Sequence, residues 1–254
     1  MSTLSVVILT KNEQDNIAKC LASASWADEI IVYDSNSTDG TAKIATDLGA
    51  TVVTDAEWQG YGKQRIKAQK HTTCDWVLML DADEIITAEL KTEIQQKLQG
   101  NNTAIIYAVP RLSFCFGRFI HHSGWYPDYV YRLYARNKTQ YNDAMVHEKL
   151  VIPSDMHIEK LKYDLLHYTY KDMNHYLVKS AHYASIWAKD KHASGKTTTL
   201  TTAVLHGIAC FVKMYLVRAG FLDGKQGFLL ALLSAHSTFV KYADLWSYHY
   251  KNKD

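Results

Sequence analysis

The chain of 254 residues lacks several features that would assign it to a whole class of proteins. Its four cysteines are scattered without the pair spacing of a zinc site, which indicates reduced thiols rather than a disulfide framework. Its formal net charge is only +2, so no general surface for nucleic acid is indicated. No internal repeat, low-complexity tract or linker is evident, and the length suits one large domain or a domain with a substantial appendage.

Two further absences concern membranes. The first residues run straight into an apolar strand without the basic stretch and cleavage site of a secretory signal, so we expect a cytoplasmic protein without a leader. No window reaches about 18 uncharged apolar residues, because residues 203–217 contain His206 and Lys213, and residues 227–240 form too short a run. We therefore expect that the chain does not cross a membrane.

An alternation of apolar strands and helices occupies the first 85 residues. Strands are expected at residues 4–9, 29–33, 51–54 and 76–80, with helices beginning near residue 17 and at residues 41–48 and 59–70 between them. Such alternation predicts a parallel α/β sheet with helices on both faces and functional loops along one edge. A further amphipathic helix is expected at residues 87–98, with Thr87 as its cap.

The second half of the chain is richer in tyrosine and histidine. Short segments at residues 105–110 and 130–134 are expected to extend the sheet. Helices are expected at residues 173–189, 201–219 and 227–246, packed on the same body.

The stretch DWVLMLDADE, residues 75–84, is an apolar run that ends in acid. It has the composition of a buried strand, and carboxylates at its end would lie where open α/β sheets place their ligands. Asp81 and Asp83 suit a hard divalent cation, because Mg²⁺ takes one or two protein carboxylates and fills its other positions with water and phosphate oxygens. Taken alone, the same pattern also describes a solvated acidic turn.

Three segments in this order resemble the family 2 inverting glycosyltransferases with a GT-A fold. They are VVILTKNE (residues 6–13), IVYDSNSTDGT (31–41) and LDADE (80–84). Farther along, Trp125, Pro127, Asp128, RLY (132–134), VHE (146–148) and FLDG (221–224) look like the subgroup of lipopolysaccharide core β-1,4-glucosyltransferases. Ile66 departs from the subgroup, where asparagine is common, and Asn36 stands where many members have glycine.

This resemblance implies a mixed, mainly parallel α/β sheet flanked by helices, followed by a helical C-terminal extension. The expected catalytic domain covers residues 1–170, with a nucleotide-binding half at about 1–100 and an acceptor half at about 101–170. The extension covers residues 171–254. The implied donor is UDP-glucose, and the implied acceptor is an inner-core heptose attached to Kdo and lipid A.

The resemblance also assigns residues to the nucleotide. The loop with Thr10, Asn12 and Glu13 would flank it, and Asp34 would accept a hydrogen bond from the uracil N–H. Pairing of a carboxylate with an amide selects the base, because a mismatched base leaves a desolvated charge unpaired. An Asx-turn or a helix cap is the structural alternative for Asp34, and Glu13 fits a cap of its own helix equally well.

For the diphosphate, Asp83 is the expected ligand of Mg²⁺ or Mn²⁺, and Asp81 reaches either the metal or the ribose. Lys63 and Arg65 are candidates for contacts with the diphosphate or members of a solvated basic helix face. Arg132 serves the diphosphate or an acceptor phosphate, or alternatively forms an ion pair with Asp128. His147 and His167 either complete the metal shell or are satisfied hydrogen-bonding residues.

An inverting transfer needs a general base that removes the proton of the acceptor hydroxyl. Glu148 and Asp128 are the two candidates, and Glu148 is slightly favoured because it follows the sheet segments on the acceptor side. Competing functions are transfer of another UDP-sugar to a different glycan, a sugar-1-phosphate nucleotidyltransferase, and a non-catalytic nucleotide-sugar binding protein. The loop at Thr10 lacks the glycine-rich, basic character expected of the nucleotidyltransferase.

The C-terminal helices mix basic and aromatic residues, which suits peripheral contact with an anionic membrane that presents a lipid-linked acceptor. The site of action would then be the cytoplasmic face of the inner membrane. Ordinary amphipathic helices packed on the domain, or an oligomer formed through them, are the alternatives.

Overall fold

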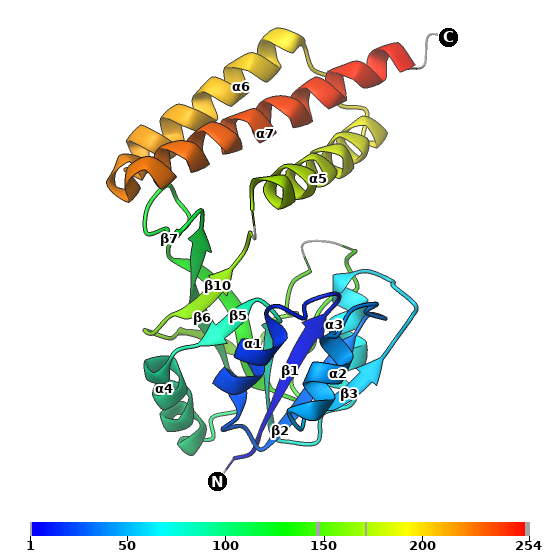
Figure 1. Cartoon of the computed structure of the whole chain (residues 1–254), viewed down its shortest axis with the longest axis vertical. Coiled ribbons are helices and arrows are strands. Elements are labelled where there is room, and N and C mark those ends of the chain that lie inside the picture. The colour runs from blue at the N-terminus through cyan, green and yellow to red at the C-terminus, as the bar shows by residue number, and fades with distance from the viewer. Residues whose placement is uncertain (1, 146–147, 171, 252–254) are drawn as a thin grey trace. The chain divides into compact units, whose positions relative to one another are not determined.

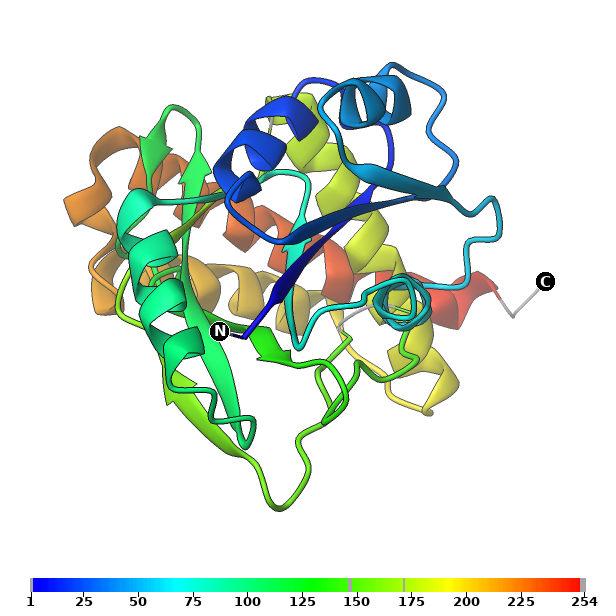
Figure 2. The same ribbon diagram turned by 90° about the horizontal axis from the view of Figure 1, so that it is seen from below.

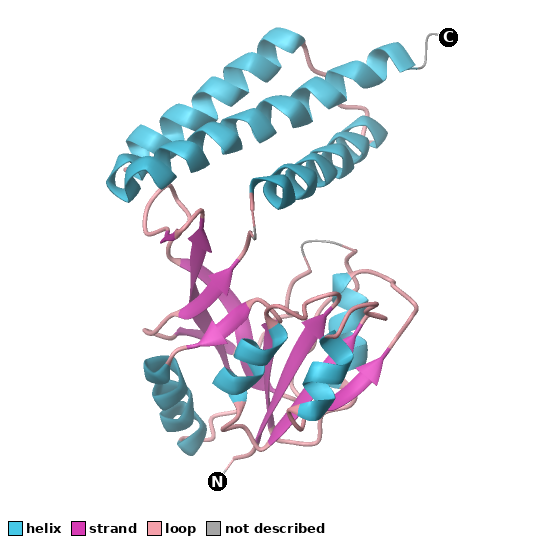
Figure 3. Ribbon diagram, viewed as in Figure 1, coloured by secondary structure: helices cyan, strands magenta, loops and turns pink. Residues whose placement is uncertain are grey.

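The computed structural model describes residues 2–145, 148–170 and 172–251, and the chain divides into two compact units. The N-terminal unit comprises Met1–Arg111 and Asp128–His167, and the C-terminal unit comprises Leu112–Pro127 and Tyr168–Asp254. Figure 3 shows strands and helices mixed in the first unit and helices dominating the second. The segment Leu112–Pro127, which the sequence places in the acceptor half, therefore groups with the C-terminal helices.

The parallel part of the sheet follows the predicted alternation closely (Figure 1). Its strands lie in the order β3-β2-β1-β4 and pair in parallel. They are β1 (Leu4–Thr10), β2 (Glu29–Asp34), β3 (Thr51–Thr54) and β4 (Trp76–Asp81), separated by α1 (Ile17–Ala24), α2 (Thr41–Asp47) and α3 (Tyr61–Gln69).

The rest of the sheet is mixed and contains strands that are too short for a clear sequence pattern. Beyond β4 the strand order is β8-β6-β10-β5, and β9 also pairs with β6. The elements are β5 (Glu84–Ile86), α4 (Ala88–Gln99), β6 (Ile105–Cys115), β8 (Asp128–Ala135), β9 (His157–Lys160) and β10 (Leu165–Tyr168). Thr87 caps α4 as predicted, because its hydroxyl accepts the N–H of Leu90 at 3.2 Å.

The two faces of the sheet are both covered, which explains why its central strands are apolar throughout. Along β1, Val6 and Ile8 belong to one core cluster with residues of α1 and α4. The intervening Val7 belongs to a second cluster with Ala68 of α3. A strand that alternates between two buried faces has no polar side, so the sequence reads as a continuous run.

The C-terminal unit is built around two long antiparallel helices, α6 (Leu200–Val212) and α7 (Gly224–Lys251), which Figures 1 and 2 show side by side. A π-helical turn, η1 (Lys213–Val217), and a 3-10 turn, η2 (Gly220–Asp223), connect them. The unit also contains β7 (Arg118–Phe119) and α5 (Met173–Ala193). The helices are therefore longer than, or interrupted differently from, the ranges that the sequence predicts.

Asp223 explains why Leu112–Pro127 groups with these helices. Its carboxylate is fully buried and accepts the backbone N–H groups of His121 at 3.2 Å and His122 at 2.8 Å. Ile120 and Leu230 share a small apolar cluster beside it. Buried carboxylates need such partners, so Asp223 fixes the loop to the start of α7.

One helical segment bears on the expectation that the chain does not cross a membrane. The continuous helical segment Leu200–Val217 has 18 residues and is long and apolar enough to cross a bilayer, and only 11% of it is buried. His206 and Lys213, which led the sequence analysis to reject this segment, are too few to offset its apolar residues. The described part of the chain therefore contains one helix that could span a membrane by length and composition.

Candidate active site

The site is organised by three neighbouring strand ends. Thr10 of β1 lies opposite Asp34 of β2, and Leu9 lies opposite Asp81 of β4. Because these strands are parallel, their carboxyl ends meet at one edge of the sheet. The sequence motifs therefore come together in space, as expected for a ligand site of an open α/β sheet.

The loops that follow β1 and β2 are tied to each other. The side-chain oxygen of Asn12 accepts the N–H of Thr38 at 2.8 Å, and the hydroxyl of Ser37 accepts the N–H of Asn12 at 2.8 Å. Asn12 and Asn36 both have positive φ angles, 56° and 59°. Asparagine tolerates this left-handed conformation, so Asn36 can stand where relatives have glycine.

Asp34 is buried, at 1% exposure, and its carboxylate accepts hydrogen bonds from the turn that follows it. Its carboxylate accepts the N–H of Ser37 at 2.8 Å and the hydroxyl of the same residue at 2.5 Å. Glu13 likewise has a local contact, since its carboxylate accepts the side-chain N–H of Asn16 at 2.7 Å. The structural alternatives for both residues are thus present, and their contacts with a nucleotide stay predictions.

The acidic turn after β4 is closed by Glu84. Glu84 is fully buried, and its Oε2 accepts the backbone N–H of Asp81 at 2.9 Å. Its Oε1 accepts hydrogen bonds from Arg132 at 2.9 Å and from Arg111 at 3.4 Å. Glu84 therefore shapes the turn and is itself neutralised by two guanidinium groups.

Arg65 joins this turn to a base candidate. It is 2% exposed, and it donates to Asp81 at 2.7 Å through Nη2 and to Glu148 at 2.8 Å through Nε. Its guanidinium also lies 5.1 Å from the centre of the Tyr141 ring, a cation–π contact. Arg65 is therefore not part of a solvated helix face, whereas Lys63 on the same helix is exposed.

Two glycines allow the segment 142–145 to pack closely on the start of α3. The backbone at Ala144 crosses the first turn of α3, where Gly62 N–H donates to Ala144 O at 3.0 Å. A Cβ at Gly62 would lie only 2.1 Å from Asn142 O, so no other residue fits without displacement. Gly60 precedes the helix with a φ of 98°, which glycine adopts readily.

Asp81 is held between two arginines. Its Oδ1 accepts from Arg65 and its Oδ2 from Arg132, the latter at 2.5 Å. Burial opposes ionisation of Asp81, but the charges of Arg132 and Arg65 outweigh it and hold the pKa of Asp81 well below its usual range. Burial likewise opposes the charge on Arg132, but Asp81 and Glu84 raise the pKa of Arg132 above its ordinary value. In this state both oxygens of Asp81 are engaged within the protein.

Asp83 has a different environment. Its carboxylate lies 3.4 Å from Nε2 of His167, and the side chains of Asp83 and His167 are 20% and 12% exposed. Within residues 2–145, 148–170 and 172–251, no cluster of three or more such side chains could hold a metal by itself. One carboxylate and one imidazole still suit Mg²⁺ or Mn²⁺, which complete their shells with water and phosphate oxygens. His147, the other candidate, lies outside the described residues.

The second base candidate, Asp128, is paired with a residue that the sequence analysis missed. Arg111 donates twice to its Oδ2, at 2.6 and 3.0 Å. The proposed pairing of Arg132 with Asp128 is wrong, because the two residues stand four positions apart on β8, about 13 Å along a strand. Arg111 lies directly opposite Asp128 on the neighbouring strand β6. The pairing register of β6 and β8 therefore identifies it as the partner of Asp128.

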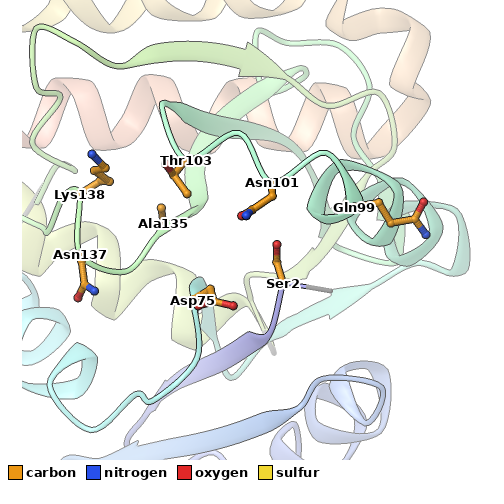
Figure 4. Close-up of a pocket in the computed structure, with 8 residues that line it drawn as sticks. All are labelled: Ser2, Asp75, Gln99, Asn101, Thr103, Ala135, Asn137 and Lys138. Carbon is orange, nitrogen blue, oxygen red and sulfur yellow. The ribbon is translucent and has the colours of Figure 1, made fainter.

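A pocket of about 530 Å³ lies elsewhere in the N-terminal unit (Figure 4). It is lined by Ser2, Asp75, Gln99, Asn101, Thr103, Ala135, Asn137 and Lys138. Ser2 and Asp75 immediately precede β1 and β4, so this pocket borders the amino ends of the strands, away from the acidic turn.

Comparison with known proteins agrees with this arrangement. An uncharacterized glycosyltransferase of Rickettsia prowazekii is 30% identical over 96% of this chain and 87% of its own. The lipopolysaccharide core biosynthesis glycosyltransferase LpsC of Rhizobium meliloti is 27% identical, with 97% and 93% covered. The crystal structure of S. aureus TarS 1-349 in complex with UDP-GlcNAc matches with a TM-score of 0.50 and 18% identity, covering 98% of this chain and 92% of that one.

The fold expectation is confirmed: a mixed, mainly parallel GT-A sheet is flanked by helices and followed by a helical C-terminal region. The profile of glycosyl transferase family 2 matches residues 5–157, which include the three strand ends and Glu148. The chain therefore belongs to glycosyl transferase family 2, and it is a hexosyltransferase.

Proposed function

We propose that this enzyme is a metal-dependent, inverting transferase that moves glucose from UDP-glucose to a heptose of the lipopolysaccharide inner core. The likeness to LpsC over nearly the whole of both chains supports the core acceptor. The observation that carries the proposal is the acidic turn of Asp81 and Asp83 at the shared strand edge, joined through Arg65 to Glu148.

The donor is held at the ends of β1, β2 and β4. The loop with Thr10, Asn12 and Glu13 flanks the nucleotide, and Asp34 accepts the uracil N–H. Asp83 and His167 hold Mg²⁺ or Mn²⁺, which when bound offsets the charge on the leaving diphosphate. Asp81 orders the turn through its two arginines, and Lys63, which is exposed, remains available to the diphosphate.

Glu148 acts as the general base. Arg65 holds its Oε1, so the carboxylate is oriented while Oε2 remains to receive the proton of the acceptor hydroxyl. The hydroxyl oxygen then bonds to the anomeric carbon from the face opposite the departing UDP. The bond from that carbon to the diphosphate oxygen breaks, and the configuration inverts.

Asp128 is the alternative base. Arg111 occupies only its Oδ2, and its side chain is 44% exposed, so Oδ1 is accessible to an acceptor. Nη2 of Arg132 donates to both Asp81 and Glu84, and the role of Arg132 in this proposal is therefore to hold the acidic turn.

The acceptor in this proposal is the heptose of a heptose–Kdo–lipid A molecule, which resides in a membrane. The enzyme would then act at the cytoplasmic face of the inner membrane through peripheral contact. Association of several copies through the C-terminal helices is the alternative use of those helices.

A panel of nucleotide sugars, incubated with a heptose–Kdo–lipid A acceptor and Mn²⁺ or Mg²⁺, tests the donor and acceptor together. The expected result is UDP release that is fastest with UDP-glucose. Mass analysis of lipooligosaccharide from a strain without the enzyme should show the loss of one hexose. Preference for another UDP-sugar would contradict the assignment of UDP-glucose as donor. An unchanged lipooligosaccharide mass would contradict the assignment of the core heptose as acceptor.

A further inference from the structure

The helix α6 turns its large apolar side chains outward, unlike an ordinary surface helix. Its face toward α7 carries small residues: Ala203 and Gly207 are fully or nearly fully buried, and a Cβ at Gly207 would lie 3.2 Å from the carbonyl oxygen of Ala235. The ring of His206 stacks on Tyr242 with centroids 4.1 Å apart. One side of α6 is therefore packed against α7, and the opposite side is exposed.

The opposite side is apolar. Leu205, Ile208 and Val212 of α6 and Leu216 of η1 recur at spacings of three and four residues and are between 41% and 61% exposed. We call these four residues the apolar stripe. A helix at a protein surface normally turns polar residues outward, and a continuous outward row of leucine, isoleucine and valine marks an interaction surface.

Exposed apolar residues continue beyond the stripe. Val217 is 73% exposed, and Phe221 and Leu222 in η2 are 49% and 54% exposed. Exposed basic residues border this end: Lys213, Arg218 and Lys225, which we call the basic margin. Large apolar side chains beside lysine and arginine form the composition that binds at the interface of anionic membranes.

Charge identifies the kind of surface that fits. From Lys189 to Asp244 the chain contains seven basic residues and three acidic residues, and one of the three, Asp223, is fully buried. A second copy of the same positive surface would be repelled, whereas anionic headgroups attract each lysine or arginine near the membrane. We propose that the apolar stripe and the basic margin dock on an anionic lipid bilayer, with α6 lying in the plane of the interface.

The partner helix argues against insertion across the bilayer. α7 packs along α6 and carries Ser234, His236 and Lys241 within its 28 residues. A spanning α6 would take these groups of α7 into hydrocarbon, where polar and charged side chains are costly. Docking in the plane buries the stripe while α7 stays in water.

This inference rests on the proposed function only in so far as a lipid-linked acceptor gives the enzyme a reason to meet a membrane. Flotation of the full-length protein with phosphatidylcholine vesicles, with and without phosphatidylglycerol, tests it without donor or acceptor. The variant Leu205→Glu/Ile208→Glu places two carboxylates in the stripe. The matched control is Leu48→Glu/Val151→Glu, because both positions are exposed apolar residues of the N-terminal unit.

The expected result is binding to phosphatidylglycerol-containing vesicles that falls at least about tenfold in the stripe variant and is unchanged in the control, since affinity scales with buried apolar area. Lys213→Gln/Lys225→Gln should weaken binding and reduce its salt dependence. Equal binding of stripe variant and wild type, or no binding by wild type, overturns the inference. If the wild-type protein does not bind vesicles but forms a dimer that the stripe variant does not form, the stripe is an interface with a second copy instead.

Resistance of the wild-type protein to alkaline extraction from membranes would show a spanning helix and overturn docking in the plane. An assay with a soluble heptose acceptor fragment tests the proposed function separately from membrane docking. Both the stripe variant and the control should release UDP from UDP-glucose with that fragment at the wild-type rate, whatever their vesicle binding.

Discussion

Replacement of Arg65 by methionine removes the residue that joins the acidic turn to Glu148. Arg65 is 2% exposed, and it donates at 2.7 Å to Asp81 and at 2.8 Å to Glu148. Removal of one partner from a buried ion pair costs about 3–5 kcal/mol, because a buried charge is left without compensation. Arg132 still contacts Asp81, so we expect the lower part of that range.

Urea unfolding followed by tryptophan fluorescence measures this cost. With a denaturant slope of about 2–3 kcal/mol/M, the midpoint of Arg65→Met should fall by about 1–1.5 M. Lys63→Met is the matched control for stability, because Lys63 is exposed on the same helix and such substitutions change the free energy of unfolding by about 0.5 kcal/mol or less.

The same variant tests the orientation of the base. With Glu148 released from Arg65, turnover should fall by about 10²–10⁴, the usual contribution of a positioned general base. Arg65→Lys keeps the charge but not the two-pronged donor, so its stability should recover more than its turnover. A methionine variant that unfolds at the wild-type urea concentration and turns over at the wild-type rate would refute this role.

Two further predictions concern the carboxylates. Glu148→Gln should lower turnover by about 10²–10⁴ while UDP binding, measured by calorimetry, is retained, whereas Asp128→Asn should have the smaller effect; the reverse order assigns the base to Asp128. The charges of Arg132 and Arg65 hold the pKa of Asp81 below its ordinary value, so Asp81 stabilises the fold above about pH 4 and this contribution is lost as pH falls below that value. The gap in unfolding free energy between wild type and Asp81→Asn should therefore narrow from pH 7 to about pH 3, and a constant gap would contradict the pairing.

The sequence predicted the parallel part of the fold because each buried strand carries its own apolar run. β3 was predicted at its observed bounds, and Thr87 was recognised as a cap because its hydroxyl acts on a helix within the same segment. The strands β5, β9 and β10 have three or four residues each, so pairing across the sheet, rather than local composition, determines them.

The sequence predicted which carboxylates lie at the strand ends, but it did not predict the ion pairs that hold them. The carboxylates Asp81 and Asp83 could be placed because they follow a buried strand directly. The partners of Asp81 come from α3 and β8, and no local pattern records such long-range contacts. Arg65 consequently resembled a solvated helix residue, although Gly62 allows a distant loop to cover it.

The same limit applies to α6. Residues His206 and Lys213 argued against a membrane helix when the segment was considered alone. In the folded chain, α7 covers one side of α6, and the apolar residues of the other side remain exposed. Only the packing shows which residues of an apolar segment face outward.

The rate of UDP release by Asp83→Ala, with UDP-glucose, Mn²⁺ and a heptose–Kdo–lipid A acceptor, tests the metal-dependent transfer most directly. Asp47→Ala, an exposed carboxylate on α2, is the control and should turn over as wild type does. We expect Asp83→Ala to lose turnover by at least about 10³-fold, because the charge on the leaving diphosphate loses its stabilisation. Turnover of Asp83→Ala at the wild-type rate would contradict the assignment of Asp83 to the metal and the diphosphate.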